Sequence, residues 1–128
     1  MSTKLRVLIV DDSRDQLYLL ERMVSKSDCE SRTCPDSNDA TQIAKEFEPH
    51  VIFLDIAMPG LDGFEVAEDL HDLNLRDYLL VALTSYSDEA HRRECEASGF
   101  NVFLAKPPSV DEVASVLRQA KERFLTSV

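Results

Sequence analysis

The chain has 128 residues, 44% of them hydrophobic, and its 24 acidic and 14 basic side chains give a formal net charge of −10. This length and composition predict one soluble globular domain over residues 1–128. Such an acidic chain is a poor ligand for nucleic acid or an anionic membrane surface, because both carry negative phosphates. No apolar stretch approaches the roughly 20 residues that a membrane-spanning helix needs.

The N-terminus and the cysteines indicate a cytoplasmic protein. Met1–Lys4 leads directly into the first apolar run, which leaves no room for a signal peptide. Cys29, Cys34 and Cys95 form an odd set without the spacing of a metal site. Because Cys29 and Cys34 lie five residues apart in an expected strand, their side chains should point to opposite faces of the sheet. We therefore expect reduced thiols.

Short apolar runs alternate with helix-like stretches along the first half of the chain. In order, these are a strand ending at Val10, a helix from near Ser13 to Val24, a polar strand over 30–34, a helix from about 35 to 48, and a strand over 51–54. Runs this short and this apolar predict buried parallel strands. Ser13 is a candidate helix cap.

The second half continues the alternation. A turn-rich loop over 58–63 precedes a helix carrying Phe64 to Leu70, a strand over 79–84, a helix over about 87–98 closed by Gly99, a strand over 101–105 and a last helix opened by a Ser109–Glu112 capping box. Five strands and five helices in strict alternation predict a doubly wound α/β fold, with helices on both faces of a five-stranded parallel sheet. Periodicity does not determine the strand order.

Four of the strands end at polar residues suited to phosphoryl chemistry. Asp11 and Asp12 follow the first strand, and Asp55, Thr84 and Lys106 end the third, fourth and fifth strands. Binding crevices of parallel sheets lie beyond the carboxyl ends of the strands, so these side chains should converge. Two like charges 4 Å apart repel by about 4 kcal/mol at an effective dielectric near 20. Carboxylates without His or Cys favour Mg²⁺, or Mn²⁺, as the compensating cation.

Single residues of this set have simpler interpretations. One aspartate at a strand end is most often a helix cap, a strand-end threonine is often only a strand residue, and Lys106 could form a plain ion pair with the acids. Tyr18 falls outside the apolar stripe of its helix, and it is either an exposed ring packed on that helix or a contact for a partner.

The motifs resemble those of response-regulator receiver domains of two-component signalling. The resemblance covers essentially the whole chain and rests on four segments in order: Val10-Asp11-Asp12-Ser13, Leu54-Asp55-Ile56-Ala57-Met58-Pro59-Gly60, Leu83-Thr84-Ser85 and Ala105-Lys106-Pro107. It implies a flavodoxin-like sheet of order 2-1-3-4-5.

The resemblance also implies roles for the residues at the strand ends. Asp55 is similar to the aspartate that accepts a phosphoryl group from phosphohistidine. Asp12, Asp55 and the backbone carbonyl of Ala57 would ligate Mg²⁺ directly, and Asp11 would act through water. Lys106 would hold one phosphoryl oxygen.

A switch is implied as well. Thr84 would hydrogen-bond another phosphoryl oxygen, and Phe103 matches the switch aromatic, although from the sequence alone it could be a plain core residue. The family implies partner binding on the face of the fourth helix, fifth strand and fifth helix. Its partners are a histidine kinase or histidine phosphotransfer protein and a downstream protein effector that the sequence does not identify.

Ala57 and Tyr86 occupy positions that flank the path of hydrolytic water in the family. Neither side chain offers an acid or amide to orient water, so we expect an altered phosphoryl lifetime. The other interpretation is that both are ordinary residues at the rim of the site.

Two other classes of protein fit less well. An aspartyl-phosphate hydrolase on a similar fold would usually carry an Asp-x-Asp pair after the first strand, whereas Asp11 and Asp12 are adjacent. A nucleotide-binding domain would carry a glycine-rich loop there. A receiver that acts only as a scaffold is disfavoured because no site residue is missing. We expect a non-enzymatic switch that catalyses only its own phosphorylation and dephosphorylation.

Overall fold

The computed structural model describes residues 4–56, 63–73, 77–84, 93 and 99–125, and these contain one parallel five-stranded sheet. The strands are β1 (Leu5–Val10), β2 (Cys29–Cys34), β3 (Val51–Asp55), β4 (Leu79–Thr84) and β5 (Val102–Ala105). Their order in the sheet is β2-β1-β3-β4-β5, and every neighbouring pair is parallel. The predicted flavodoxin-like order is therefore confirmed.

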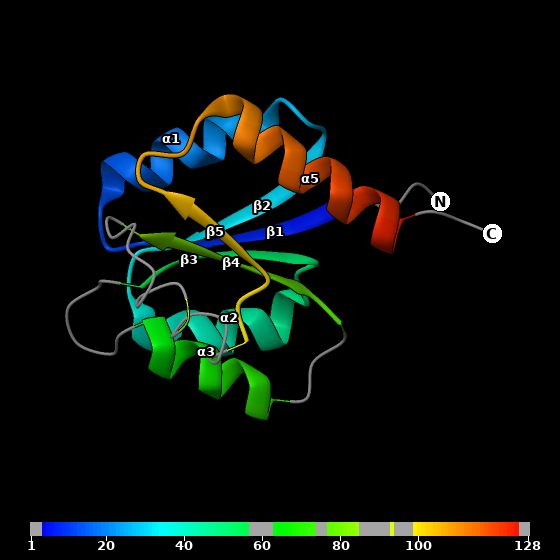
Figure 1. Cartoon of the computed structure of the whole chain (residues 1–128). Helices are drawn as coiled ribbons and strands as arrows, with labels where there is room; N and C mark the ends of the chain where they lie inside the picture. The colour runs from blue at the N-terminus through cyan, green and yellow to red at the C-terminus, as the bar shows by residue number, and fades with distance from the viewer. Residues whose placement is uncertain (1–3, 57–62, 74–76, 85–92, 94–98, 126–128) are drawn as a thin grey trace.

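Helices cover both faces of the sheet (Figure 1). The described α-helices are α1 (Arg14–Ser25), α2 (Ala40–Phe47), α3 (Gly63–Asp72) and α5 (Val110–Phe124). The predicted helix over 87–98 lies outside the described residues except for Arg93. Gly99, its predicted cap, has a φ of +93°, which glycine adopts without the steric cost that a side chain would add.

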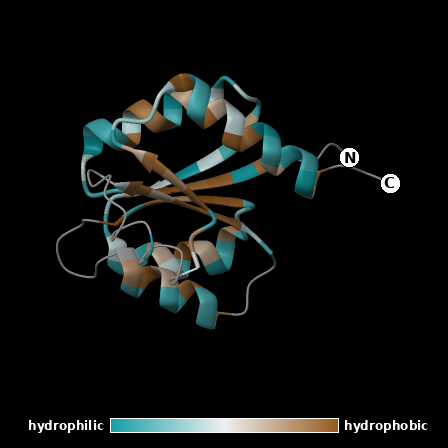
Figure 2. Ribbon diagram, viewed as in Figure 1, coloured by the Kyte–Doolittle hydropathy of each residue, from teal (hydrophilic) through white to brown (hydrophobic). Residues whose placement is uncertain are grey.

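The sheet separates two apolar cores. Leu17 and Leu20 of α1 and Val113 and Leu117 of α5 pack on one face, together with side chains such as Phe53. Buried residues of α2 and α3 fill the other face with alternate side chains of the same strands. Figure 2 shows the strands as largely hydrophobic, with hydrophilic residues on the outward faces of the helices. Strands buried on both faces explain why their sequences read as continuous apolar runs.

The helix starts follow the predicted capping chemistry, with one correction. Ser13 accepts a hydrogen bond from the backbone N–H of Gln16, and Ser109 and Glu112 form the complete capping box. The second helix does not begin at residue 35 as an α-helix. Asp36 caps a 3-10 turn, η1 (Ser37–Asp39), and the α-helix starts only at Ala40.

The two described cysteines lie on opposite faces of β2, as predicted. Cys34 is fully buried in the core below α2, whereas Cys29 packs partly against the core below α1 and α5. Both are free thiols. Among the described helices, none has the length and apolar character required to cross a bilayer.

Candidate functional site

The register of the central strands brings the first and third strand ends together. Val10 lies opposite Leu54, so the residues that follow them, Asp11 and Asp55, lie side by side at the carboxyl edge of the sheet. Asp55 in turn lies opposite Leu83, and the backbone N–H of Ile56 donates to the carbonyl of Leu83. Backbone pairing, and not side-chain attraction, therefore imposes the proximity of the two carboxylates.

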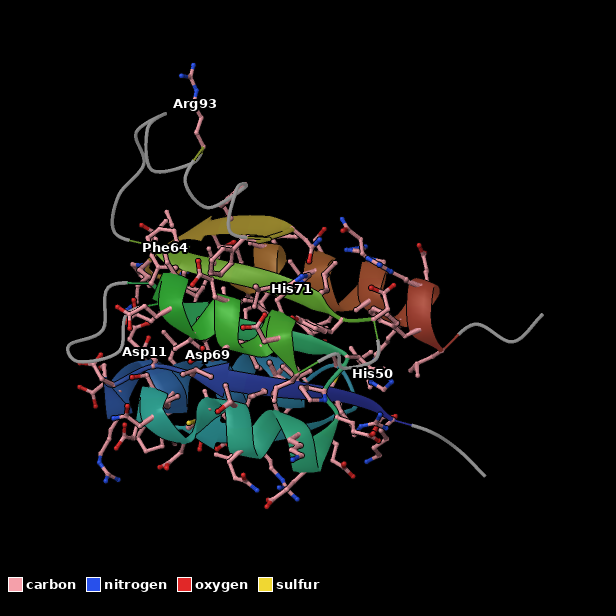
Figure 3. The ribbon with its side chains drawn as sticks, turned by 90° about the horizontal axis from the view of Figure 1, so that it is seen from below. Asp11, His50, Phe64, Asp69, His71 and Arg93 are labelled. Carbon is pink, nitrogen blue, oxygen red and sulfur yellow. The ribbon has the colours of Figure 1, made fainter. Side chains whose placement is uncertain are left out.

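Asp11, Asp12 and Asp55 form a compact acidic group. One carboxylate oxygen of each lies within 4.8 Å of the others, as expected from the sequence. Asp11 and Asp55 are buried, and Asp12 is exposed. Figure 3 shows Asp11 towards the left-hand end of the sheet.

Lys106 reaches this acidic group from β5. Its Nζ lies 3.0 Å from Asp55 Oδ2, a hydrogen-bonded ion pair, and 3.1 Å from Asp11 Oδ2. The contact with Asp11 lacks the alignment of a hydrogen bond, so the buried Oδ2 of Asp11 retains acceptor capacity. The backbone N–H of Lys106 donates to the carbonyl of Thr84, which fixes where the lysine leaves the strand.

The pKa values of two of these groups show how the site is balanced. Burial raises the pKa of Asp11 despite the hydrogen bond from the Ser13 backbone and the nearby Lys106 ammonium, and the charge of Asp55 adds to the rise. Burial lowers the pKa of Lys106, but its contacts with Asp55 and Asp11 outweigh burial and raise that pKa overall. Among the described residues, the Lys106 ammonium pairs with two buried carboxylates, Asp11 and Asp55, so a second cation would be stabilised beside them.

This donor set fits a small hard cation. Three convergent carboxylates and a buried oxygen with spare acceptor capacity are the ligands that Mg²⁺ uses in proteins. Asp12 is the exposed member of the group, so a cation could bind water or phosphoryl oxygens on the side that faces Asp12 and the solvent.

Thr84 and Phe103 lie in the neighbouring strands. Thr84 is buried at the end of β4 and lies opposite Ala105. Phe103 lies opposite Ala82 and is partly buried against the core below α2 and α3. Ala57 and Tyr86, assigned above to the metal site and to the phosphoryl lifetime, lie outside the described residues.

Ser13 has a role that the sequence interpretation missed. We assigned it only as a helix cap, but its backbone N–H also donates to Asp11 Oδ1 at 3.0 Å and orients that carboxylate. The backbone N–H of Asp11 donates to the carbonyl of Cys34. The signal was present in the sequence, since an aspartate often accepts from the backbone two residues later.

Comparison with known proteins identifies the family. The response regulator receiver domain family matches residues 7–118, so this chain belongs to that family. An uncharacterized 14.6 kDa protein of Leptolyngbya boryana is 32% identical over 114 residues, which cover 88% of this chain and 87% of that protein.

Solved structures show the same fold. Chemotaxis protein CheY4 of Vibrio cholerae is 24% identical with a TM-score of 0.86, over 92% of this chain and 99% of that chain. The receiver domain of the putative response regulator NarL of Mycobacterium tuberculosis is 27% identical with a TM-score of 0.82, over 94% and 98% of the two chains.

Membership of the family fixes the general function. Receiver domains are phosphoacceptor signalling modules, not classical enzymes, and they interact with histidine kinases and downstream effectors. They bind Mg²⁺ through an acidic pocket, and the group of Asp11, Asp12 and Asp55 fits such a site.

Proposed function

We propose that Asp55 accepts a phosphoryl group from a phosphohistidine of a histidine kinase or histidine phosphotransfer protein. An oxygen of the Asp55 carboxylate attacks phosphorus, the P–N bond breaks, and its electron pair returns to the imidazole. The observation that carries this proposal is the contact of Asp55 Oδ2 with Lys106 Nζ at 3.0 Å, inside a group of three carboxylates.

Each neighbouring side chain has a proposed part in the transfer. The Lys106 ammonium moves from the Asp55 carboxylate to a phosphoryl oxygen and offsets the negative charge of that oxygen. Asp11, Asp12, Asp55 and the carbonyl of Ala57 hold Mg²⁺, which when bound supplies positive charge to the phosphoryl oxygens. Thr84 donates its hydroxyl to another of these oxygens.

The phosphoryl group would then act as a switch. It adds roughly −1.5 to −2 charges at neutral pH. Attraction of Thr84 and Lys106 to the new oxygens would shift β4 and β5, and the Phe103 ring would follow Thr84 inward. We propose that the face of the fourth helix, β5 and α5 presents this change to a protein effector, and that Ala57 and Tyr86 set its lifetime.

We also propose a cytoplasmic location. It is supported by the free thiols of Cys29 and Cys34, which the fold holds on opposite faces of the sheet.

The test is incubation with a small acyl phosphate and Mg²⁺, followed by intact mass measurement. We expect at most one added phosphoryl group per chain, dependent on Mg²⁺ and lost in Asp55→Asn. Asp69→Asn, a change on the exposed side of α3, is the matched control and should label like the native protein. Steady turnover of the phosphodonor without a labelled protein would instead support the hydrolase.

A further inference from the structure

A polar pocket lies near the amino ends of the strands, whereas the acidic site lies at their carboxyl ends. It has a volume of about 240 Å³ and is lined by Arg6, Glu48, Pro49, His50, Asp77 and Phe124. In Figure 3, His50 and Asp11 lie towards opposite ends of the sheet. None of these lining residues has a part in the phosphoryl chemistry proposed above, so the pocket requires a separate explanation.

Main-chain hydrogen bonds hold the walls of this pocket in place. The backbone N–H of Arg6 donates to His50 Nδ1 at 2.9 Å, and the backbone N–H of His50 donates to the carbonyl of Arg6 at 2.8 Å. The backbone N–H of Leu79 donates to the carbonyl of His50 at 2.8 Å. Since β1, β3 and β4 are all anchored here, the pocket is preformed.

The Arg6 guanidinium is a fixed cation without an acidic partner among the described residues. Its Nε donates to the carbonyls of Phe47 and Glu48, at 3.0 and 2.9 Å, which orients the guanidinium plane. The terminal nitrogens carry four further N–H groups, and no described residue accepts from them. Half-buried donors of this kind suit a carboxylate, which can accept two parallel hydrogen bonds.

An aromatic wall lies beside this cation. The rings of His50 and Phe124 have centroids 5.5 Å apart and are tilted by 33°. The Arg123 guanidinium lies 5.1 Å from the Phe124 ring centroid and pairs with Asp77 at the rim. Contacts with His50 and Arg123 therefore hold the Phe124 ring in place, and a planar apolar group could pack against it.

The acids at the pocket do not neutralise Arg6. Asp77 is occupied by Arg123, and the exposed Glu48 makes no ion pair with Arg6. We propose that the pocket binds a small aromatic carboxylate, with its carboxylate on Arg6 and its ring against Phe124 and His50. The volume is below the roughly 300 Å³ of ordinary ligand pockets, which limits the ligand to about one substituted ring.

Benzoate is the probe for this proposal, and benzamide, its neutral isostere, is the control. We expect saturable changes at the backbone amides of Arg6, His50 and Phe124 in ¹⁵N-correlated NMR spectra with benzoate, and none with benzamide. Because the chain carries a net charge of −10, general attraction cannot account for binding of an anion.

Three variants separate the parts of the site. Arg6→Gln should weaken benzoate binding about 10-fold or more, since it removes charge-assisted hydrogen bonds. Phe124→Leu should weaken it about threefold or more through loss of ring contact. Glu48→Gln should leave binding unchanged or tighten it. Equal binding of benzamide, changes confined to other surfaces, absence of saturation, or native affinity in Phe124→Leu would overturn the proposal.

Discussion

Lys106 and Asp55 pair at 3.0 Å although β4 lies between their strands. The lysine extends from the end of β5 over the end of β4 to reach the carboxylate of β3, and it touches Asp11 beyond β1 at 3.1 Å. One half-buried ammonium therefore connects the end of β5 with the ends of β3 and β1, which are not its neighbours in the sheet. The stability of the metal-free protein should depend on this connection.

Removal of the Lys106 charge should destabilise the metal-free protein. Lys106→Met keeps the apolar stem but leaves Asp11 and Asp55 without their cation, and breaking a buried pair from one side is costly. We expect the Tm in EDTA to fall by roughly 5 °C or more. Lys106→Arg, which keeps the charge, should lose less, and an equal loss in both variants would show that packing and not charge is responsible.

Neutralising one acid should have the opposite effect. Asp55→Asn relieves repulsion in the acidic group, so its Tm in EDTA should exceed that of the native protein by roughly 2–6 °C. Addition of Mg²⁺ should raise the Tm of the native protein more than that of Asp55→Asn. A variant of equal or lower stability in EDTA would contradict the electrostatic account.

The pH dependence of stability should reveal the raised pKa of Asp11. The fold raises the pKa of Asp11, so this carboxyl group ionises at a lower pH in the unfolded chain than in the folded protein. The resulting destabilisation is absent below the unfolded pKa, about 3.9, grows as pH rises, and is complete above the folded pKa. In EDTA, Asp11→Asn should therefore gain stability relative to the native protein from pH 4 to pH 7. The control Asp69→Asn should show a constant difference, and a constant difference for Asp11→Asn would refute the account.

Cys34 should resist alkylation in the folded protein. Its thiol is fully buried, and burial raises its pKa to about 11, so little thiolate forms at pH 8. With iodoacetamide, peptide mass measurement should find Cys34 unmodified over a period in which it is fully labelled in denatured protein. Cys29 is half-buried and should react faster than Cys34. Equal rates for the two thiols would contradict the burial of Cys34 at the end of β2.

The sequence predicted the fold closely because its strands are short, apolar and buried on both faces. Such runs leave few alternatives once helical stretches separate them, as for Val51–Asp55 and Leu79–Thr84. Periodicity could not supply the strand order, because every central strand reads alike; it came from the family resemblance. The 3-10 start of the second helix was missed, since Asp36 and the polar residues after it suit either kind of turn.

The convergence of the site residues followed from the rule that the ends of parallel strands share one edge. The finer contacts did not follow from it. The orientation of Asp11 by the Ser13 backbone and the unequal contacts of Lys106 with its two acids depend on loop geometry and side-chain reach. The pocket at Arg6 was missed entirely, because its lining residues come from four separate segments with no shared motif.

The most direct test of the central claim is the position of the phosphoryl group. After incubation with an acyl phosphate and Mg²⁺, borohydride reduces an aspartyl phosphate to homoserine, which tandem mass spectrometry locates in the peptide. We predict homoserine at position 55 alone. Homoserine at position 11 or 12, or none in protein that has gained the mass of a phosphoryl group, would contradict the assignment of Asp55 as the phosphoacceptor.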